Sequence, residues 1–202
     1  MNKFKILFLF PNETMVGVVP SNLAILSSYL KLSNFDVKLF DCTLYQSIRY
    51  DKNETQDNIR EKLGHIKKTE IDKYAPLKTT NAYDDFMDTV NSYKPDIIAI
   101  TLTDSTIQIS YSFLEMIKHK NIPVVVGGVG VLFSYEKILK SGYVNYVCLG
   151  EGEISLPELC SKIQKNEDTT NIKNICYKNE NAPWVIERLE CYIFNPKYKT
   201  KL

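Results

Sequence analysis

Five short apolar runs, separated by longer segments, constrain the fold of this chain more than any other feature. The runs are Lys5–Phe10, Val37–Asp41, Asp96–Leu102, Pro123–Val126 and Val144–Leu149. Short runs that are apolar almost throughout are typical of parallel strands covered on both faces. Parallel strands need long crossover connections, and the segments between the runs are long enough to supply them.

Several of the connecting segments carry apolar residues at helical spacing. Ser21 suits the N-cap of a first helix, whose inner face holds Leu23, Leu26 and Leu30. Further helices are expected over residues 83–93, 107–119, 134–140 and 155–165, the last opened by a capping box at 155–158.

This alternation predicts a Rossmann-like or flavodoxin-like α/β fold, a doubly wound five-stranded parallel sheet of order 2-1-3-4-5. Strand two should be an edge strand, with Val37 and Leu39 turned inward and Lys38 outward. Residues 43–92 form a helical insertion after strand two, and 175–178 with 184–186 form a small C-terminal hairpin. We therefore expect an α/β domain over 1–168, followed by a linker hairpin and a loose tail over 169–202.

Composition excludes several functional classes. Lys and Arg number 25 and Asp and Glu 24, which gives no electrostatic reason to expect nucleic acid or a membrane surface as partner. The apolar start, Met1–Phe10, is too short to span a membrane and lacks a cleavage site for secretion. The five scattered cysteines form no C-x-x-C pair, so we expect buried thiols in a cytoplasmic protein and no metal site.

Glycines and hydroxyls follow the strands at one end of the predicted sheet. Thr101, Thr103 and Ser105 follow strand three, and the loops after strands four and five hold Gly127, Gly128, Gly130, Gly150, Glu151 and Gly152. The carboxyl ends of parallel strands meet at one edge, where ligands of such sheets bind. Glycines there suit a large ligand lying against backbone. Gly130 taken alone is better explained by a tight turn.

Other kinds of site are less well supported. No G-x-x-x-x-G-K-[ST] is present, and the loop after strand one lacks G-x-G-x-x-G. A receiver-type acidic pocket needs a lysine after strand five, where Leu149-Gly150 stands. Neither His65 nor His119 is placed for nucleophilic catalysis or cobalt ligation. Glu151 and Glu153 suit the start of a helix better than acid–base chemistry, so we expect no catalytic residue.

The chain resembles the cobalamin (vitamin B12)-binding domain that precedes the catalytic barrel in cobalamin-dependent radical S-adenosylmethionine enzymes. The resemblance rests on Pro95–Thr101, on Val124–Gly128 and on Asn145–Glu153 with its G-E-G-E, and it covers about residues 3–165. It implies a corrin ring on the strand-end edge, touched by the hydroxyls of 101, 103 and 105 and by backbone at 127 and 128. It also implies a slot beside the sheet for the nucleotide tail, with 150–152 on its far side.

Two departures from that family matter. The loop Pro11–Pro20 lacks the D-x-H-x-x-G histidine that ligates cobalt in classical B12 domains, as do many of the radical enzymes. The C-x-x-x-C-x-x-C triad that holds a [4Fe–4S] cluster is also absent. An excised domain, a separate subunit and a degenerate relative would each explain this, and we favour the first because the hairpin resembles the linker to the barrel.

The expected function is therefore that of a cobalamin-binding module of a radical S-adenosylmethionine enzyme, most simply in methyl transfer, without turnover by itself. The [4Fe–4S] cluster and S-adenosylmethionine would belong to the barrel, in cis or in a separate subunit. A substitution of Gly128 by a bulky residue is expected to abolish cobalamin binding without disturbing the fold. The alternative is a cofactor-free, flavodoxin-like interaction or regulatory domain that docks through residues 43–92.

Overall fold

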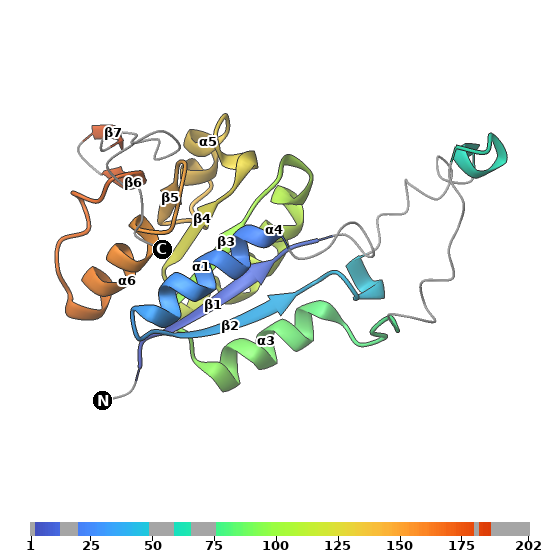
Figure 1. Cartoon of the computed structure of the whole chain (residues 1–202), viewed down its shortest axis with the longest axis horizontal. Coiled ribbons are helices and arrows are strands. Elements are labelled where there is room, and N and C mark those ends of the chain that lie inside the picture. Colours follow the sequence, from blue (N-terminus) through green and yellow to red (C-terminus); the bar gives the residue numbers. More distant parts are fainter. Residues whose placement is uncertain (1–2, 13–19, 49–58, 66–75, 180–181, 187–202) are drawn as a thin grey trace, which may run out of the picture.

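The computed structural model describes residues 3–12, 20–48, 59–65, 76–179 and 182–186. Its centre is one twisted sheet of order β2-β1-β3-β4-β5-β6-β7 (Figure 1). The first five strands are mutually parallel. They are β1 (Lys5–Phe10), β2 (Asp36–Asp41), β3 (Ile97–Thr101), β4 (Val124–Gly127) and β5 (Tyr146–Cys148). The predicted α/β class and the order 2-1-3-4-5 are confirmed for these strands.

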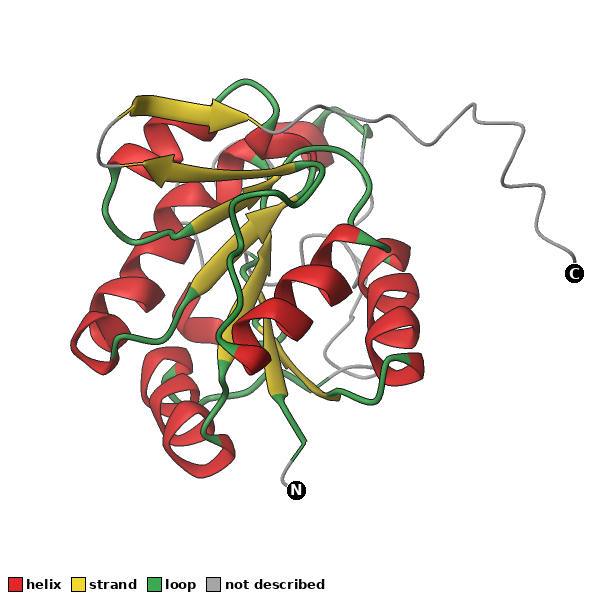
Figure 2. Cartoon of the chain, turned by 90° about the vertical axis from the view of Figure 1, so that its left-hand side faces the viewer, coloured by secondary structure: helices red, strands yellow, loops and turns green. Residues whose placement is uncertain are grey.

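Helices cover both faces of the sheet (Figure 2). One face packs on α1 (Ser21–Leu32) and α6 (Ser155–Lys165), and the other on α3 (Ala82–Tyr93), α4 (Ile107–Ile117) and α5 (Tyr135–Lys140). In β1, Ile6 and Phe8 join the first core, and Leu7 and Leu9 join the second. The strand has no solvent face, which explains its continuous apolar sequence.

The C-terminal hairpin differs from the expectation because it continues the sheet. β6 (Ile175–Asn179) pairs antiparallel with β5, and β7 (Ala182–Ile186) pairs antiparallel with β6, giving a sheet of seven strands. Ile175 and Cys176 are fully buried between β5 and the helices. The hairpin thereby covers the edge that β5 would otherwise expose. The division of the chain at residue 168 stays a prediction.

The helix expected over residues 83–93 is confirmed as α3, but it is a crossover helix packed in the core, so the insertion predicted over residues 43–92 does not include it. Asn81 caps α3 by accepting a hydrogen bond from the Tyr83 N–H at 2.8 Å, and the helix ends at Lys94 with φ 53°. Phe86 is 0% exposed and meets the rings of Phe40 and Phe113 edge to face. The insertion is thus confined to about residues 43–81, of which 49–58 and 66–75 lie outside the described residues.

Several local predictions also need correction. Leu39 is 42% exposed, whereas its neighbour Phe40 is buried, because the far end of this edge strand is covered only on the α3 side. Neither Ser21 nor Ser155 is an N-cap: α1 follows Pro20 and α6 follows Ile154, with no side-chain capping bond at either start. A capping box does occur between Thr103 and Thr106.

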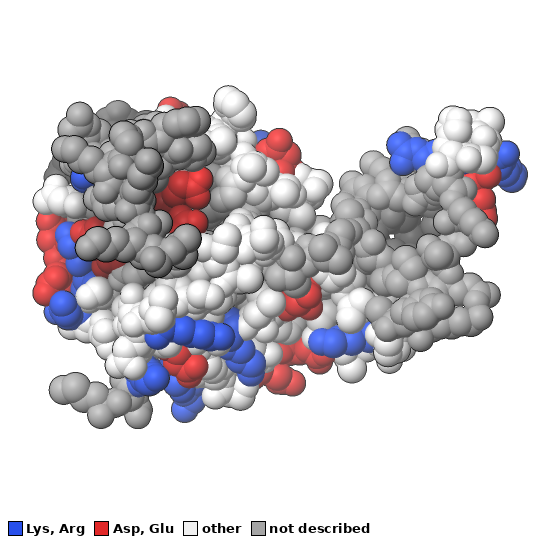
Figure 3. All heavy atoms as spheres, in the orientation of Figure 1, with Lys and Arg blue, Asp and Glu red and all other residues white. Residues whose placement is uncertain are grey.

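The thiols behave as predicted within the described part of the chain. Cys42, Cys148, Cys160 and Cys176 are free and buried, and Cys191 lies outside the described residues. Among the described residues no cluster of His, Cys, Asp or Glu could hold a metal ion, and none of the described helices is long and apolar enough to cross a membrane. Basic and acidic side chains are intermingled on the described part of the face in Figure 3, with no continuous basic surface.

Burial of these thiols makes stability sensitive to alkali. Burial raises the pKa of Cys42 from 9.0 to about 12, and burial with the nearby Glu153 and Glu151 raises that of Cys148 likewise to about 12. Below pH 9 the two thiols are protonated in both the folded and the unfolded chain. Between about pH 9 and about 12 they lose their protons only in the unfolded chain. Because this favours the unfolded chain, the free energy of unfolding should fall as the pH rises through this range. Urea unfolding from pH 7 to 11 measures this. Cys148→Ala should make the free energy of unfolding fall less steeply with pH above pH 9. An unchanged pH dependence would contradict the raised pKa of the Cys148 thiol.

Candidate functional site

A broad hollow, here called the edge cavity, lies across the carboxyl ends of the parallel strands and has a volume of about 910 Å³. Each loop predicted to meet at this edge contributes to it. Its lining comes from Phe10–Asn12, Pro20, Asn22, Thr101–Thr103, Ser105, Thr106, Gly128, Val129, Leu132, Gly150 and Glu151. The predicted gathering of glycines and hydroxyls at one end of the sheet is therefore present, and its size falls in the range of small-molecule sites.

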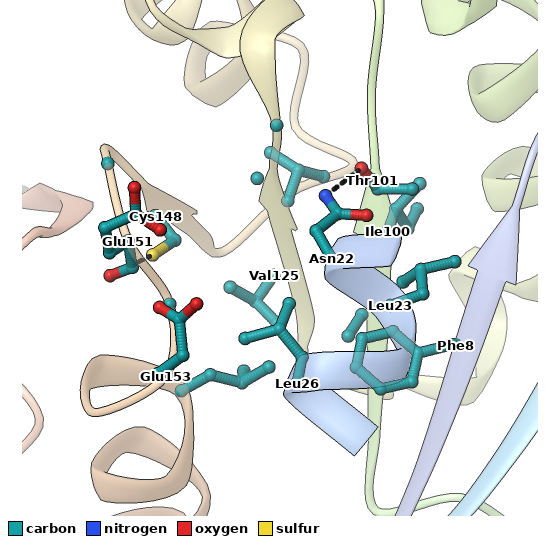
Figure 4. Close-up of a pocket in the computed structure, with 17 residues that line it drawn as sticks. Phe8, Asn22, Leu23, Leu26, Ile100, Thr101, Val125, Cys148, Glu151 and Glu153 are labelled. Carbon is teal, nitrogen blue, oxygen red and sulfur yellow. Dashed lines mark hydrogen bonds between the residues drawn. The ribbon is translucent and has the colours of Figure 1, made fainter. Parts of the chain in front are cut away.

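A narrower hollow of about 100 Å³, here called the α1–α6 slot, descends along the sheet between α1 and α6. Figure 4 shows Asn22, Leu23 and Leu26 of α1 on one side of β4, and Cys148, Glu151 and Glu153 on the other. The slot and the edge cavity adjoin each other, because both are lined by Asn22, Thr101, Gly128, Gly150 and Glu151. Together they form a wide edge with a side channel.

The predicted hydroxyls are presented by the loop after β3. Thr103 Oγ1 lies 3.1 Å from Ser105 Oγ and 3.2 Å from Thr106 Oγ1, and both Thr103 and Ser105 are exposed. Thr106 Oγ1 accepts from the Thr103 N–H at 3.0 Å, which holds the loop in shape. At the mouth of the slot, Asn22 Nδ2 donates to Thr101 Oγ1 at 3.5 Å. These groups can donate to and accept from a polar ligand rim.

The glycines of the site differ in their structural reasons. Gly128 has φ +102°, and a Cβ there would lie 2.8 Å from the Leu102 carbonyl oxygen. A Cβ at Gly130 would lie 2.6 Å from the Thr103 carbonyl carbon, and Gly130 lines neither hollow. Both glycines are thus required by packing against the β3 loop. The expectation that a bulky residue at 128 leaves the fold intact is overturned by this geometry.

Gly127 and Gly152 are different, because side chains there would point into the slot. A Cβ at Gly127 would be in ordinary contact with Cys148 Cβ at 3.6 Å. One at Gly152 would lie 3.1 Å from Leu26 Cδ2 on the opposite wall. Gly150 also lines both hollows; its φ is +96°, and a Cβ there would be in ordinary contact with Asn174 Nδ2 at 3.8 Å.

The charged and sulfur groups of the site offer no nucleophile. The Cys148 thiol is buried, its Sγ lies 3.9 Å from the Glu151 carbonyl oxygen, and its raised pKa keeps it protonated at neutral pH. Glu151 and Glu153 stand at the mouth and along the wall of the slot. His65 and His119 are exposed and line neither hollow.

Sequence reasoning missed several lining residues. Asn12 is 6% exposed, lines the edge cavity and donates from Nδ2 to Thr43 Oγ1 at 3.1 Å. Thr43 Oγ1 in turn donates to Asp41 Oδ1 at 2.6 Å, so β2 fixes the loop after β1. Leu23 and Leu26 were read only as core residues of a helix. The small Ala99 within an otherwise bulky strand was the available signal for space above the sheet.

A comparison with protein families decides the affiliation. The model of the B12 binding domain matches residues 17–160, which is well over half of the chain. The chain belongs to the B12-binding domain family. Within this B12-binding domain, the matched residues include α1, the β3, β4 and β5 loops and the start of α6, which supply most of the lining of both hollows.

Known proteins similar to this B12-binding domain are much longer. An uncharacterized methyltransferase of Pyrococcus horikoshii is 29% identical over 99 residues, covering 48% of this chain and 22% of that protein. TsrM of Kitasatospora setae, a radical S-adenosylmethionine methyltransferase solved with cobalamin and a [4Fe–4S] cluster, superposes with TM-score 0.67 at 17% identity over 93% of this chain and 29% of its own.

The cobalamin-dependent S-adenosylmethionine radical enzyme OxsB, solved with aqua-cobalamin, gives TM-score 0.67 at 18% identity over 93% of this chain and 22% of its own. Identities this low establish a shared fold. The B12-binding domain described here therefore spans less than a third of these relatives.

Proposed function

We propose that this chain binds cobalamin, with the corrin ring in the edge cavity and the nucleotide tail in the α1–α6 slot. The observation that carries the proposal is that the two hollows adjoin and share five lining residues. A corrinoid has a matching shape, a broad plate with one long substituent. Family membership supports the same ligand.

The residues present suit such a ligand. The exposed hydroxyls of Thr103 and Ser105 can bond the amide side chains at the corrin rim, and backbone near Gly128 and Gly150 can approach the ring closely. The role of Gly130 in this proposal is to hold the loop. When bound, the cobalt supplies the chemistry, and the protein places and shields it. None of the described lining residues is a histidine, so the described part of the site offers no imidazole for cobalt.

We also propose that the domain serves a larger cobalamin-dependent radical S-adenosylmethionine enzyme, in methyl transfer, and does not turn over alone. The share of TsrM and OxsB that it spans supports this. The rim of the edge cavity also carries exposed apolar side chains, with Val129 73%, Leu132 48% and Phe133 97% exposed. Such a rim suits a covering catalytic barrel, in cis or as a subunit, that would carry the cluster.

Mixing the purified chain with hydroxocobalamin and passing it through gel filtration tests the binding proposal. The protein fraction is expected to be coloured, with about one corrinoid per chain. If the nucleotide base of cobalamin lies in the slot, its nitrogen cannot coordinate cobalt. The electron paramagnetic resonance spectrum of the cobalt(II) form should therefore lack the superhyperfine splitting that this nitrogen produces. An unrelated protein of similar size, which has no corrinoid site, serves as the control for non-specific retention of hydroxocobalamin. Colourless protein at micromolar hydroxocobalamin would refute the proposal.

A further inference from the structure

The α1–α6 slot is lined mainly by apolar side chains, and most of its polar side chains lie toward its mouth. Its deep lining consists of carbon side chains, those of Phe8, Leu23, Leu26, Ala99, Val125 and Leu156. All of these except Leu26 are 4% exposed or less. The lining side chains that bear nitrogen or oxygen are Asn22, Thr101, Glu151 and Glu153. The first three also line the edge cavity, whereas Glu153 lies further along the wall of the slot, level with Val125 and Leu26 in Figure 4.

The strand backbone beneath the slot, at Ala99 and Val125, offers no free polar group. Ala99 and Val125 are paired with each other in the middle of the parallel sheet, and each strand is also paired on its other side. Their amide groups are therefore engaged in the sheet. Among the described residues, no buried side-chain nitrogen or oxygen lacks a partner. The Cys148 thiol, a weak donor, and the carboxylate of Glu153, a hydrogen-bond acceptor, are the polar side chains beyond the mouth.

We propose that this slot selects corrinoids by the chemistry of their lower base, taking a benzimidazole with apolar substituents and discriminating against a purine. This inference rests on the proposed function and specifies which nucleotide tail of the corrinoid the slot accepts. The ring nitrogens of adenine that accept hydrogen bonds would exchange water for aliphatic carbon and a carboxylate that cannot donate to them, and each buried polar group without a partner weakens binding. The two methyl groups of 5,6-dimethylbenzimidazole would instead gain from the same contacts.

Leu26 is the residue on which this selection can be tested. It is half-buried, it forms part of the α1 wall, and its Cδ2 is the atom nearest to a Cβ built on Gly152. Leu26→Gln places an amide in the slot without removing a fully buried core residue. Ile25→Gln on the same helix is the matched control, because Ile25 is 45% exposed and lines neither hollow.

Equilibrium dialysis of the full chain against three corrinoids provides the measurement: cobalamin, the analogue with adenine as lower base, and cobinamide, which has no nucleotide tail. Cobalamin should bind about tenfold to a hundredfold more tightly than the adenine analogue, the range that one or two unpaired polar groups produce. Leu26→Gln should reduce this ratio to a few-fold or less, and Ile25→Gln should leave it unchanged. Neither variant should change cobinamide binding.

The outcomes separate this inference from the proposed function. Cobalamin and the adenine analogue binding equally, and both more tightly than cobinamide, would overturn the selection while leaving cobalamin binding in place. Equal binding of all three would overturn the placement of the tail and the selection with it. Binding of none would overturn the proposed function itself. An unchanged ratio in Leu26→Gln, with folding verified by circular dichroism, would also contradict the inference.

Discussion

Replacing Gly152 by valine is expected to reduce cobalamin affinity about tenfold to a hundredfold and to leave cobinamide affinity unchanged. A Cβ at this position already lies 3.1 Å from Leu26 Cδ2, and the two further methyl groups of valine would occupy the α1–α6 slot. Overpacking of a fitted site costs about 1–3 kcal/mol, which corresponds to that loss. Equilibrium dialysis with the two corrinoids measures it.

Two controls separate a blocked slot from a damaged fold. The neighbour that valine would meet is the far end of a flexible leucine, so the melting temperature should fall by only a few degrees. Adding Leu26→Ala to Gly152→Val restores room and should recover most of the cobalamin affinity. If Gly152→Val weakens cobinamide equally, or if the double variant does not recover, the tail does not lie in this slot.

Phe86→Ala is expected to reduce the free energy of unfolding by about 3–5 kcal/mol, the cost of removing a fully buried aromatic ring. Phe86 is 0% exposed and lies 5.3 Å from Phe40 and 5.1 Å from Phe113 between ring centroids. Since small domains are stable by about 5–15 kcal/mol, this single change removes a large part of the total. Urea unfolding followed by circular dichroism measures it.

Asp88→Ala is the matched control on the same helix, because Asp88 is exposed and should alter stability by less than about 0.5 kcal/mol. The comparison tests whether α3 belongs to the core of the sheet or to a separable insertion. A loss below about 1 kcal/mol for Phe86→Ala would show that α3 contributes little, against the structure.

The parallel sheet was predictable because its signal is local and repeated. A strand covered on both faces must be apolar at nearly every position, and β1 and β3 show this at every position except Lys5 and Thr101 at their ends. The edge strand β2 was harder, since Leu39 is exposed and Phe40 buried according to which face a helix covers. That coverage depends on α3, which lies more than forty residues further along the chain.

The site was predictable in place but not in detail. Loops that follow parallel strands must meet at one edge, so Thr101, Thr103, Gly128 and Gly150 could be brought together from the sequence. The reasons for individual glycines could not be separated in that way. Gly130 avoids a clash with the backbone of Thr103, whereas Gly152 leaves space beside Leu26. The sequence shows glycine at both positions and does not distinguish these two reasons.

By itself the sequence determined the α/β class, the order of the parallel strands, the edge that carries the site and the resemblance to cobalamin-binding domains. These follow from periodicity and from short motifs, which neighbouring residues express. The tertiary structure alone decided that the C-terminal hairpin extends the sheet, that α3 is a crossover helix and that a slot opens between α1 and α6. The slot depends on the distance between two helices about 130 residues apart in the chain, and that distance is set by packing over the whole sheet.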